Sequence, residues 1–330
     1  MSSERIAVLG SNCFTGAHFI KACRLSGATV IGFNRSPEPH PIMMPHRSVL
    51  TGEYQFCQLD MNTDMDKIEA ILDSFKPDYV VNFAAQGMVG QSWAAPLDWF
   101  QTNTLAMVDL HERLRHKTYL KKYLHCSTPE VYGNCSGLVD ETQPFAPSSP
   151  YAVSKSAADL SLMSYHRAYG FPVVFTRAAN VYGPAQQLYR IIPRSIIYFL
   201  TGRTLSLHGG GSAIRSFIHI DDVAKGTLDV LRHGKTGEAY HLATSENISI
   251  RDLVERIAHK LGVDFDGLVE VVGDRLGKDD AYLLNTSKIN SELGWSADTP
   301  LERGLDGCIQ WVKAHIEIIR EMPLDYIHKK

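Results

Sequence analysis

The sequence predicts an α/β protein in which a doubly wound parallel sheet forms one lobe and a smaller, interleaved α/β lobe completes the fold. Short, continuously apolar runs alternate with segments of helical period through the first half of the chain, as strands covered on both faces by helices require. This alternation stops at residues 182–184. The length of 330 residues also exceeds the roughly 250–300 residues that one compact core holds. We therefore expect two lobes.

Six strands are expected in the first half, each a short run rich in β-branched and aromatic residues. Between them, apolar residues recur at helical spacing over 65–75, 103–114 and 151–169. Right-handed crossovers between parallel strands place ligands at the carboxyl ends of the strands. The expected strands are 6–10, 28–33, 54–59, 79–85, 123–128 and 172–177.

The second half of the chain mixes helices with short strands. A helix is expected over 191–202 and a glycine-rich turn over 208–215. Sheet-like runs follow at 216–220 and 239–243, and residues 246–300 contain another helix, a short strand and loops. These elements are interleaved rather than repeated, so the chain is expected to cross between the two lobes more than once.

The expected lobes are therefore discontinuous in sequence. The first comprises residues 1–183 and 216–243, and the second comprises 184–215 and 244–330. An apolar helix over 304–319 closes the chain. It is assigned to the second lobe, with packing on the first lobe as the alternative.

Composition excludes several classes of protein. With 33 basic and 36 acidic residues the net charge is −3, which gives no global positive field for nucleic acid. No basic leader and no stretch of roughly 20 apolar residues is present, so no membrane association is expected and the location is expected to be cytoplasmic. The six cysteines form no CxxC pair and the 14 histidines no HExxH motif, so neither a disulfide framework nor a metal site is predicted.

A glycine loop follows the first strand and opens a helix. In this context backbone N–H groups and a helix N-terminus can hold a pyrophosphate. Cys13 stands where the motif has its middle glycine, and its side chain is expected to narrow the approach; an ordinary tight turn is the alternative. The predicted contacts are Gly10, Asn12, Cys13, Phe14, Thr15 and Gly16.

The tips of the second and third strands indicate which dinucleotide is bound. Asn34, Arg35 and Ser36 follow the second strand, and an arginine there holds a 2′-phosphate where an acidic residue would accept a ribose hydroxyl. The sequence thus favours NADP over NAD, with a solvated loop arginine as the alternative. Asp60, after the third strand, is predicted to accept from the adenine amino group, or to cap a helix instead.

A candidate catalytic group lies at the end of the fifth strand and the start of the next helix. Tyr151 and Lys155 are four residues apart and share a helix face, and a nearby cation favours the phenolate, which would let the tyrosine act as a base. Ser127, Thr128 and Glu130 end the upstream strand at the same sheet edge. A hydroxyl there can hydrogen-bond a substrate hydroxyl that the tyrosine deprotonates.

With these motifs the chain resembles the nucleotide-sugar members of the extended short-chain dehydrogenase/reductase family, from residue 6 to about residue 315. The resemblance implies a Rossmann fold, tightly bound NAD(P) and a nucleotide-diphosphate sugar as substrate. It rests on the glycine loop and on NFAAQ (82–86), QTNT (101–104), STPEVYG (127–133), SPYAVSK (149–155), RAANVYGP (177–184), IRSFIHIDDVA (214–224) and LGW (293–295).

Within this family the resemblance is to the 4,6-dehydratases, which carry a glutamate at the position of Glu130. It implies that Tyr151 takes the C4 hydroxyl proton during oxidation, that Glu130 removes the C5 hydrogen, and that water leaves from C6 before the hydride returns there. The product is a 4-keto-6-deoxy sugar nucleotide. Pro129 stands where these enzymes have Asp or Ser, and Met88 where many have histidine. Since proline has no side-chain proton, the acid for the C6 hydroxyl must be Glu130, Thr128 or water.

The resemblance also implies further contacts. The cofactor is expected to touch Met61, Ala84, Ala85, Gln86, Asn103, Ser127, Ala178 and Val181, besides Tyr151 and Lys155. The sugar nucleotide is expected to touch Met88, Ser92, Thr128, Asn180, Arg190, Arg215 and Arg275. Solvated surface positions are the alternative for each arginine, as a strand-end salt bridge is for Glu130.

Other functions remain open at this stage. An epimerase needs only the hydroxyl, tyrosine and lysine, while a uronate decarboxylase would use Glu130 and a cation such as Arg190 or Arg215. A catalytically silent dinucleotide-binding protein is a third possibility. In this family the helices 103–115 and 151–169 form a four-helix interface, so a homodimer in a polysaccharide or secondary-metabolite pathway is implied. Apolar residues that could face such a partner are Leu105, Val108, Leu160 and Tyr165.

Overall fold

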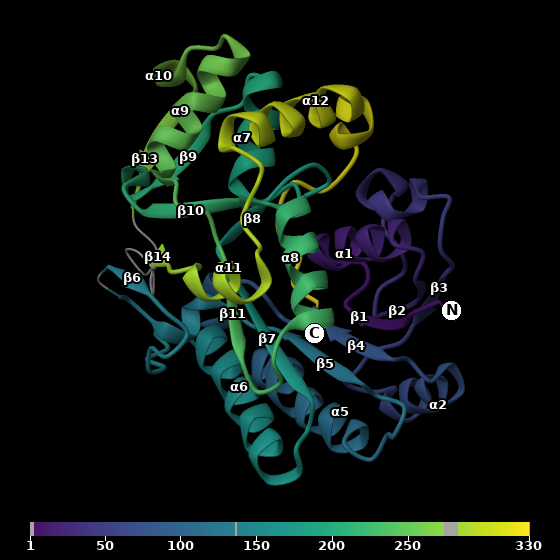
Figure 1. Cartoon of the computed structure of the whole chain (residues 1–330). Coiled ribbons are helices and arrows are strands. Elements are labelled where there is room, and N and C mark those ends of the chain that lie inside the picture. The colour runs from purple at the N-terminus through teal and green to yellow at the C-terminus, as the bar shows by residue number, and fades with distance from the viewer. Residues whose placement is uncertain (1–2, 136, 274–282, 330) are drawn as a thin grey trace.

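The computed structural model of the chain describes residues 3–135, 137–273 and 283–329. Seven parallel strands form the main sheet in the order β11-β7-β5-β4-β1-β2-β3, which confirms the predicted doubly wound sheet (Figure 1). The strands are β1 (Arg5–Leu9), β2 (Thr29–Asn34), β3 (Tyr54–Gln58), β4 (Tyr79–Asn82), β5 (Lys122–Cys126), β7 (Val173–Ala178) and β11 (Ala239–Leu242).

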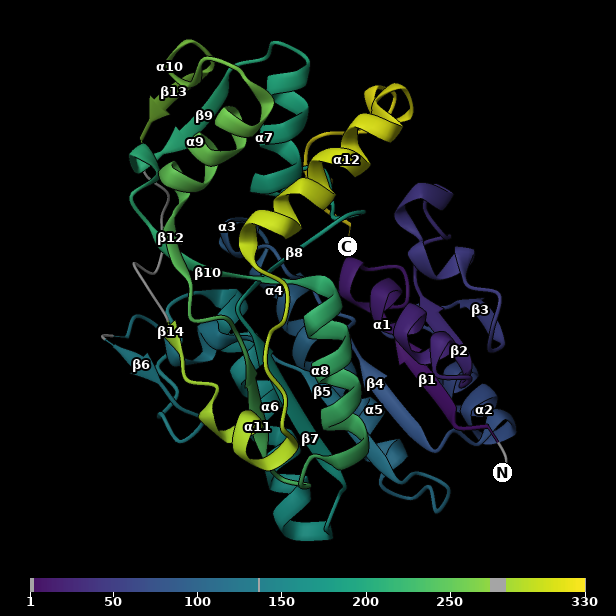
Figure 2. The ribbon, with the colours of Figure 1, turned by 45° about the horizontal axis from the view of Figure 1, so that its top comes forward.

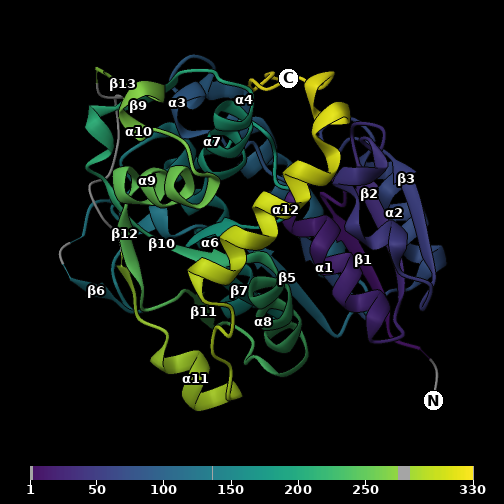
Figure 3. The same cartoon turned by 90° about the horizontal axis from the view of Figure 1, so that it is seen from above.

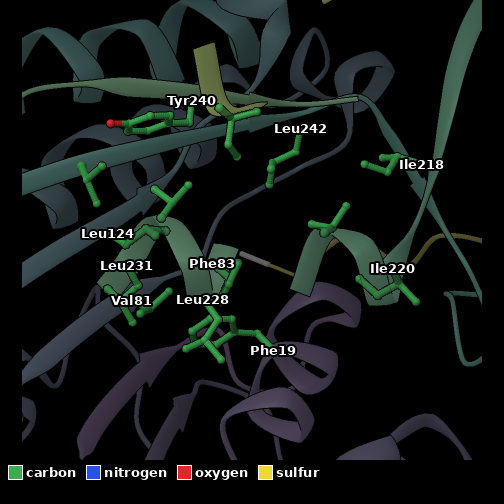
Figure 4. Close-up of a cluster of buried hydrophobic side chains, with 14 of the residues drawn as sticks. Phe19, Val81, Phe83, Leu124, Ile218, Ile220, Leu228, Leu231, Tyr240 and Leu242 are labelled. Carbon is green, nitrogen blue, oxygen red and sulfur yellow. The ribbon is translucent and has the colours of Figure 1, made fainter. Parts of the chain in front are cut away.

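Helices cover both faces of this sheet, and alternate residues of each strand point to opposite faces. Ile6 and Val8 of β1 belong to one apolar core with α1 (Phe14–Leu25), α8 (Ile220–His233) and α11 (Ser287–Leu293). Figure 4 shows part of this core, with Phe19 and Leu228 brought together beside Val81.

The opposite face of the sheet carries a second core. Ala7 and Leu9 of β1 pack there with α2 (Met65–Phe75), α5 (Ala106–Leu114) and α6 (Pro150–Tyr169). The two-residue period of β1 therefore divides its side chains between the two faces, as strands covered on both sides require.

Two expected strands are shorter than predicted because side chains at their ends turn the backbone. After β4, the Asn82 side chain accepts from Ala84 N at 3.0 Å. After β5, the Thr128 hydroxyl accepts from Glu130 N at 3.3 Å and caps η4 (Pro129–Tyr132). The same capping directs the strand-end residues into the cleft described below.

The helix expected from residue 103 begins later, at Ala106, because a π-helical turn, η3 (Gln101–Leu105), precedes it. Asn103 lies in this turn and bonds the backbone of Gln86 through both ends of its amide. The π-helical turn therefore places the Asn103 amide, just before α5, in hydrogen-bonding contact with the backbone that follows β4.

Smaller sheets and further helices lie beside the main sheet (Figure 2), and part of them encloses a third apolar core. Residues 180–182 and 214–219, parts of which were assigned to the first lobe, pair with each other in a three-stranded sheet outside the main one. The closing helix α12 (Leu301–Arg320) contributes six buried residues to the third core and packs against α7 (Ile191–Leu200). The two-lobe division itself remains a prediction.

Smaller sheets and further helices complete the fold. The small sheets are β12 (Asn247–Ser249)-β10 (Ile214–His219)-β8 (Asn180–Tyr182), β13 (Val269–Val272)-β9 (Leu205–His208) and β14 (Leu283–Leu284)-β6 (Leu138–Val139). The other helices are α3 (Val89–Ser92), α4 (Pro96–Phe100), α9 (Ile250–Leu261), α10 (Phe265–Leu268), η1 (Pro41–Met43), η2 (Pro45–Ser48) and η5 (Gly209–Gly211). Within the described ranges, no helix is both long enough and apolar enough to cross a membrane.

Candidate active site

A cavity of about 1310 Å³ lies at the carboxyl ends of the main-sheet strands and is also lined by residues of α7, β9 and β10. This is the position that a doubly wound sheet offers to a ligand. Most of the residues predicted from the sequence line it: Asn12, Cys13, Phe14, Thr15, Asn34, Arg35, Ser36, Ala85, Gln86, Met88, Ser127, Thr128, Glu130, Tyr151, Lys155, Ala178, Asn180, Val181, Arg190 and Arg215.

The glycine loop at one end of the cavity is tightly packed. A Cβ on Gly10, whose φ is +79°, would lie 2.5 Å from Ala84 N, and a Cβ on Gly16 would lie 2.3 Å from Gly10 O. Both positions therefore require glycine. Gly10 and Gly16 do not themselves line the cavity, but they let the loop between them do so.

Cys13 occupies the position where a middle glycine was expected. Its Sγ accepts from Gly16 N at 3.2 Å and caps α1, so its side chain is directed along the helix start. Burial raises the pKa of the Cys13 thiol to about 12, which keeps it uncharged at neutral pH. The loop thus presents no negative charge of its own to an anionic ligand at the N-terminus of α1.

The predicted adenosine-side residues separate into two groups. Asn12 Nδ2 and Asn34 Nδ2 both donate to Ser36 O, at 3.0 and 3.3 Å, and hold the tip of β2 against the cavity. Asp60 instead accepts from Asn62 N at 2.9 Å in the turn before α2 and does not line the cavity. The alternative that Asp60 caps the helix is wrong, since Asp64 stands at the N-cap of α2; the contact of Asp60 with adenine stays a prediction.

Met61, Ala84 and Asn103 also lie behind the cavity wall rather than in it. Met61 is part of the second core. Asn103 is buried, and its amide bonds the Gln86 backbone and Ser154 Oγ at 2.8 to 3.0 Å. Its contacts support the wall on which Gln86 is presented.

The predicted catalytic side chains meet at the ends of β5 and η4 and the first turns of α6. Ser149 caps α6 by accepting from Ala152 N at 3.2 Å, which places Tyr151 in the first turn and Lys155 one turn later. The Thr128 hydroxyl hydrogen-bonds the Tyr151 phenol. Together with Glu130, all four side chains line the same cavity.

The charge state of this group differs from the sequence expectation. Lys155 is buried, and its ammonium donates to Cys126 O at 2.8 Å and lies 3.2 Å from His125 Nε2. Burial raises the pKa of Tyr151 above its usual value, and the Glu130 carboxylate raises it further. Burial also lowers the pKa of Lys155. In this structure Tyr151 is therefore a phenol, not the phenolate that its spacing to Lys155 predicts.

A layer of buried polar side chains lies beneath the catalytic group, and the sequence analysis did not identify it. Asp159 accepts from Ser127 Oγ at 2.6 Å and from Arg177 Nη2 at 2.9 Å. Arg177 also donates to Tyr132 Oη at 2.7 Å, and the layer continues to His241, whose Nε2 lies 2.8 Å from Tyr132 Oη. Asp159 follows Lys155 by four residues, a helical spacing that could have indicated it.

Most of the residues predicted to bind the sugar nucleotide line the cavity. Asn180, Arg190 and Arg215 line it together with Met88. Ser92 is buried, donates to Val89 O at 2.6 Å and does not line the cavity, and Arg275 lies outside the described residues. The lining residues that sequence analysis missed include Tyr189, Arg194, Tyr198 and His208.

All six cysteines are free. Among residues 3–135, 137–273 and 283–329, no three His, Cys, Asp or Glu side chains gather where they could hold a metal ion. The catalytic group described above contributes hydroxyl, phenol, ammonium and carboxylate functions to the cavity.

Comparison with known proteins identifies similar chains. Residues 8–307 match the model of a family described as GDP-mannose 4,6 dehydratase. The dTDP-glucose 4,6-dehydratase of Streptomyces niveus is 32% identical over 317 residues, which cover 94% of this chain and 93% of the relative.

Two solved structures illustrate the range of similar folds. DesIV, a dTDP-glucose 4,6-dehydratase from Streptomyces venezuelae solved with NAD bound, has a TM-score of 0.88 and 32% identity, covering 95% of this chain and 98% of DesIV. The UDP-glucose 4-epimerase of Thermotoga maritima has a TM-score of 0.86 and 25% identity, covering 94% of this chain and 99% of the epimerase. Dehydratases and epimerases thus share this architecture.

Proposed function

Because the chain belongs to the GDP-mannose 4,6 dehydratase family of extended short-chain dehydrogenases/reductases, we propose how its cleft residues divide the work of that reaction. The chain is an NAD(P)-dependent nucleotide-sugar 4,6-dehydratase. Its substrate is proposed to be a nucleotide-diphosphate sugar with hydroxyls at C4 and C6. Residues 1–183 and 216–243 are proposed to hold the dinucleotide, and 184–215 and 244–330 the sugar nucleotide.

The residues present fit a nicotinamide dinucleotide. A Cβ at Gly10 would clash with Ala84 N and one at Gly16 with Gly10 O, so these glycines hold the loop close to the N-terminus of α1, and Cys13 and Thr15 of that loop line the cavity. When bound, the dinucleotide accepts a hydride from C4 of the sugar and later returns it to C6. Asn12, Thr15 and Gln86 are proposed to hold it at the strand ends.

Tyr151 is proposed to take the proton of the C4 hydroxyl, with Thr128 orienting that hydroxyl. The hydrogen bond between Thr128 and Tyr151 supports this pairing. Because burial and Glu130 hold Tyr151 in its protonated form, Lys155 must turn from Cys126 O towards the phenol for the base to form. A cation beside the phenol stabilises the phenolate.

The observation that carries the dehydratase assignment is Glu130, whose carboxylate lines the cavity and lies close enough to Tyr151 to raise its pKa. Oxidation at C4 acidifies the C5 hydrogen, which Glu130 is proposed to remove. Since Pro129 offers no proton, the proton that Glu130 has gained is proposed to leave with the C6 hydroxyl as water. The proton that Tyr151 took from the C4 hydroxyl is proposed to reach C5 when the hydride returns to C6, which regenerates the base.

Mass spectrometry of the products tests the reaction. The purified protein is incubated with NAD or NADP and a panel of nucleotide sugars that covers the common bases. Loss of one water from a panel member is expected. Loss of carbon dioxide from a uronate would indicate a decarboxylase, and an unchanged mass with a new retention time would indicate an epimerase; either result would contradict the dehydratase assignment.

The role of Glu130 is tested by separating the two halves of the reaction. Glu130→Gln is expected to abolish water loss but to leave slow reduction of the cofactor by substrate, which absorbance reports, because oxidation precedes C5 deprotonation. Tyr151→Phe is the matched comparison and is expected to block both steps. Unimpaired turnover by Glu130→Gln would remove this carboxylate from the mechanism.

Arg35 and Ser36 are proposed to give a preference for NADP, because both line the cavity at the tip of β2. A guanidinium binds a 2′-phosphate through charge-assisted hydrogen bonds. Arg35→Ala is expected to weaken NADP binding about tenfold relative to NAD, by loss of one such bond. Equal effects on both dinucleotides would contradict the assignment.

We also propose a homodimer through α5 and α6, in the cytoplasm and in a pathway to polysaccharides or secondary metabolites. Leu105, at the end of η3 just before α5, and Leu160 of α6 are 58% and 56% exposed, and an interface through these helices would bury both side chains. Analytical ultracentrifugation is expected to show a dimer that Leu160→Glu dissociates. A monomeric wild-type protein would contradict this interface.

A further inference from the structure

The C-terminal segment, residues 321–329, returns from the end of α12 to the cavity. Tyr326, Ile327 and Lys329 line the cavity together with the glycine loop. Figure 3 shows the yellow C-terminal end beside α4, and an ion pair between His328 and Asp98 of α4 joins the two. The sequence analysis assigned no role to these residues.

Lys329 contacts three residues that were predicted to bind the cofactor, and two of them, Arg35 and Ser36, were predicted for its adenosine side. Its carbonyl oxygen accepts from Arg35 Nη2 at 3.0 Å and from Gln86 Nε2 at 2.6 Å. Its ammonium donates to Ser36 Oγ at 3.0 Å. These contacts join positions 243 to 294 residues apart in sequence, so they depend on the folded chain.

Four further contacts anchor the segment on both sides of the cavity. His328 Nε2 lies 2.7 Å from Asp98 Oδ2, and the His328 ring stacks on Trp99 at 5.1 Å between centroids. Towards the second lobe, Asp325 accepts from Arg194 at 3.0 Å and the Tyr326 ring packs edge-on against Tyr189.

The strand order shows what this segment crosses. β1 lies between β2 and β4 in the main sheet. Arg35 follows β2 and Gln86 follows β4, so a carbonyl bonded to both crosses over the end of β1 and its glycine loop. A dinucleotide on this sheet places its pyrophosphate at that loop. The segment and the dinucleotide therefore require the same donors and the same space.

We propose that residues 325–329 are a determinant of cofactor affinity that competes with the dinucleotide, so that NAD or NADP binds only when this segment leaves Arg35 and Gln86. The proposal rests on the cofactor site proposed above. A protein whose competent state is only partly populated binds its ligand more weakly by that fraction. The segment thus lowers the affinity of the whole chain for the dinucleotide.

Titration of NAD into cofactor-free protein, followed by calorimetry, measures this effect. Deletion of residues 325–330 is expected to tighten NAD binding at least about tenfold, or ~1.4 kcal/mol. Asp325→Asn, which removes the anchor on Arg194, is expected to act in the same direction by about twofold. Glu317→Gln is the matched control, because it removes an exposed carboxylate paired with Arg320 on α12, and it is expected to leave binding unchanged.

Limited chymotrypsin digestion supplies a second readout that does not depend on a shortened chain. Addition of NAD to the full chain is expected to accelerate cleavage after Tyr326, measured as loss of residues 327–330 by intact mass. The control is the same digestion with nicotinamide alone. Nicotinamide lacks the adenosine and the phosphates that would compete with the segment, so it is expected to have no effect on cleavage.

Equal or weaker NAD binding after the deletion, or protection of Tyr326 by NAD, would overturn the proposal. If the full and shortened chains bind NAD with equal affinity, the competition is refuted while the cofactor site stands. If neither chain binds NAD or NADP, the proposed cofactor site falls, and the competition falls with it.

Discussion

Two networks of charged side chains in this protein have similar chemistry and different surroundings. Beneath the catalytic group, Asp159 and Arg177 are almost completely buried and each bonds further polar side chains. Between α9 and α12, Glu302 is 55% exposed and pairs with Arg256 and Lys260. Water screens the second network but not the first. Only the buried network can therefore fix the position of a neighbouring group.

The largest expected effect separates these networks by stability. Asp159→Ala leaves the Arg177 guanidinium buried without its carboxylate and is expected to lower the free energy of unfolding by about 3–5 kcal/mol. Glu302→Ala is the exposed counterpart and is expected to cost less than about 1 kcal/mol. Urea unfolding followed by circular dichroism measures both. Equal losses would show that burial does not distinguish the two networks.

The next prediction separates the loss of a catalytic side chain from the loss of the buried polar layer beneath it. Tyr151→Phe removes the proposed base and is expected to lower kcat about a thousandfold, within the range for loss of a general base. Unfolding stability should remain close to wild type. Tyr119→Phe, which removes a hydroxyl bonded to the exposed Asp73, is the control and should keep full activity. A comparable loss of activity in both variants would contradict the role of Tyr151.

The pH dependence of stability tests the buried layer at its far end. Burial lowers the pKa of His241 to about 3, whereas an unfolded-state histidine titrates near about 6.5. Between these values the unfolded chain binds a proton that the folded chain does not, so stability falls as the pH falls. From pH 6.5 to 4.5 the contribution of His241 is about 2 kcal/mol.

His241→Gln provides the comparison for that prediction, because glutamine can accept from Tyr132 Oη without titrating. Its free energy of unfolding should fall less steeply over this pH range than that of the wild type. Parallel curves would show that the pKa of His241 is the same in the folded and unfolded chains. They would contradict the description of the buried layer as a network of fixed charges and neutral donors.

The smallest expected effect lies on the exposed rim of the cavity. Arg190 is exposed and lines the substrate side, so Arg190→Ala is expected to raise KM for the nucleotide sugar about tenfold and to change kcat little, by loss of one charge-assisted contact. Arg251→Ala, an exposed arginine packed on Phe265, is the control and should leave KM unchanged. A loss confined to kcat would place Arg190 in the chemical step instead.

These regions also differ in how far the sequence predicted them. The strands of the main sheet and the helices over 65–75 and 151–169 were predicted closely, because local periodicity and a capping serine define them. Thr128, Tyr151 and Lys155 were found because a strand end and a helix start bring them to one sheet edge. Their meeting in one cavity follows from topology alone.

Other features depend on contacts that no local pattern contains. Asp60 has the residue type of an adenine acceptor, yet its carboxylate bonds the next turn. The charge state of Tyr151 depends on where Lys155 points, and Lys155 bonds the end of β5 instead. Lys329 reaches Gln86 across 243 residues of sequence. Spacing within a motif cannot report such partners, because they are brought together only by the folded chain.

Transfer of deuterium within the substrate tests the central claim most directly. The nucleotide sugar that the panel identifies is prepared with deuterium at C4, and the product is examined by mass spectrometry and NMR. The proposed mechanism predicts loss of one water and the appearance of the C4 deuterium at C6 of the 4-keto-6-deoxy product. Deuterium found again at C4, or a product that has lost no water, would contradict it.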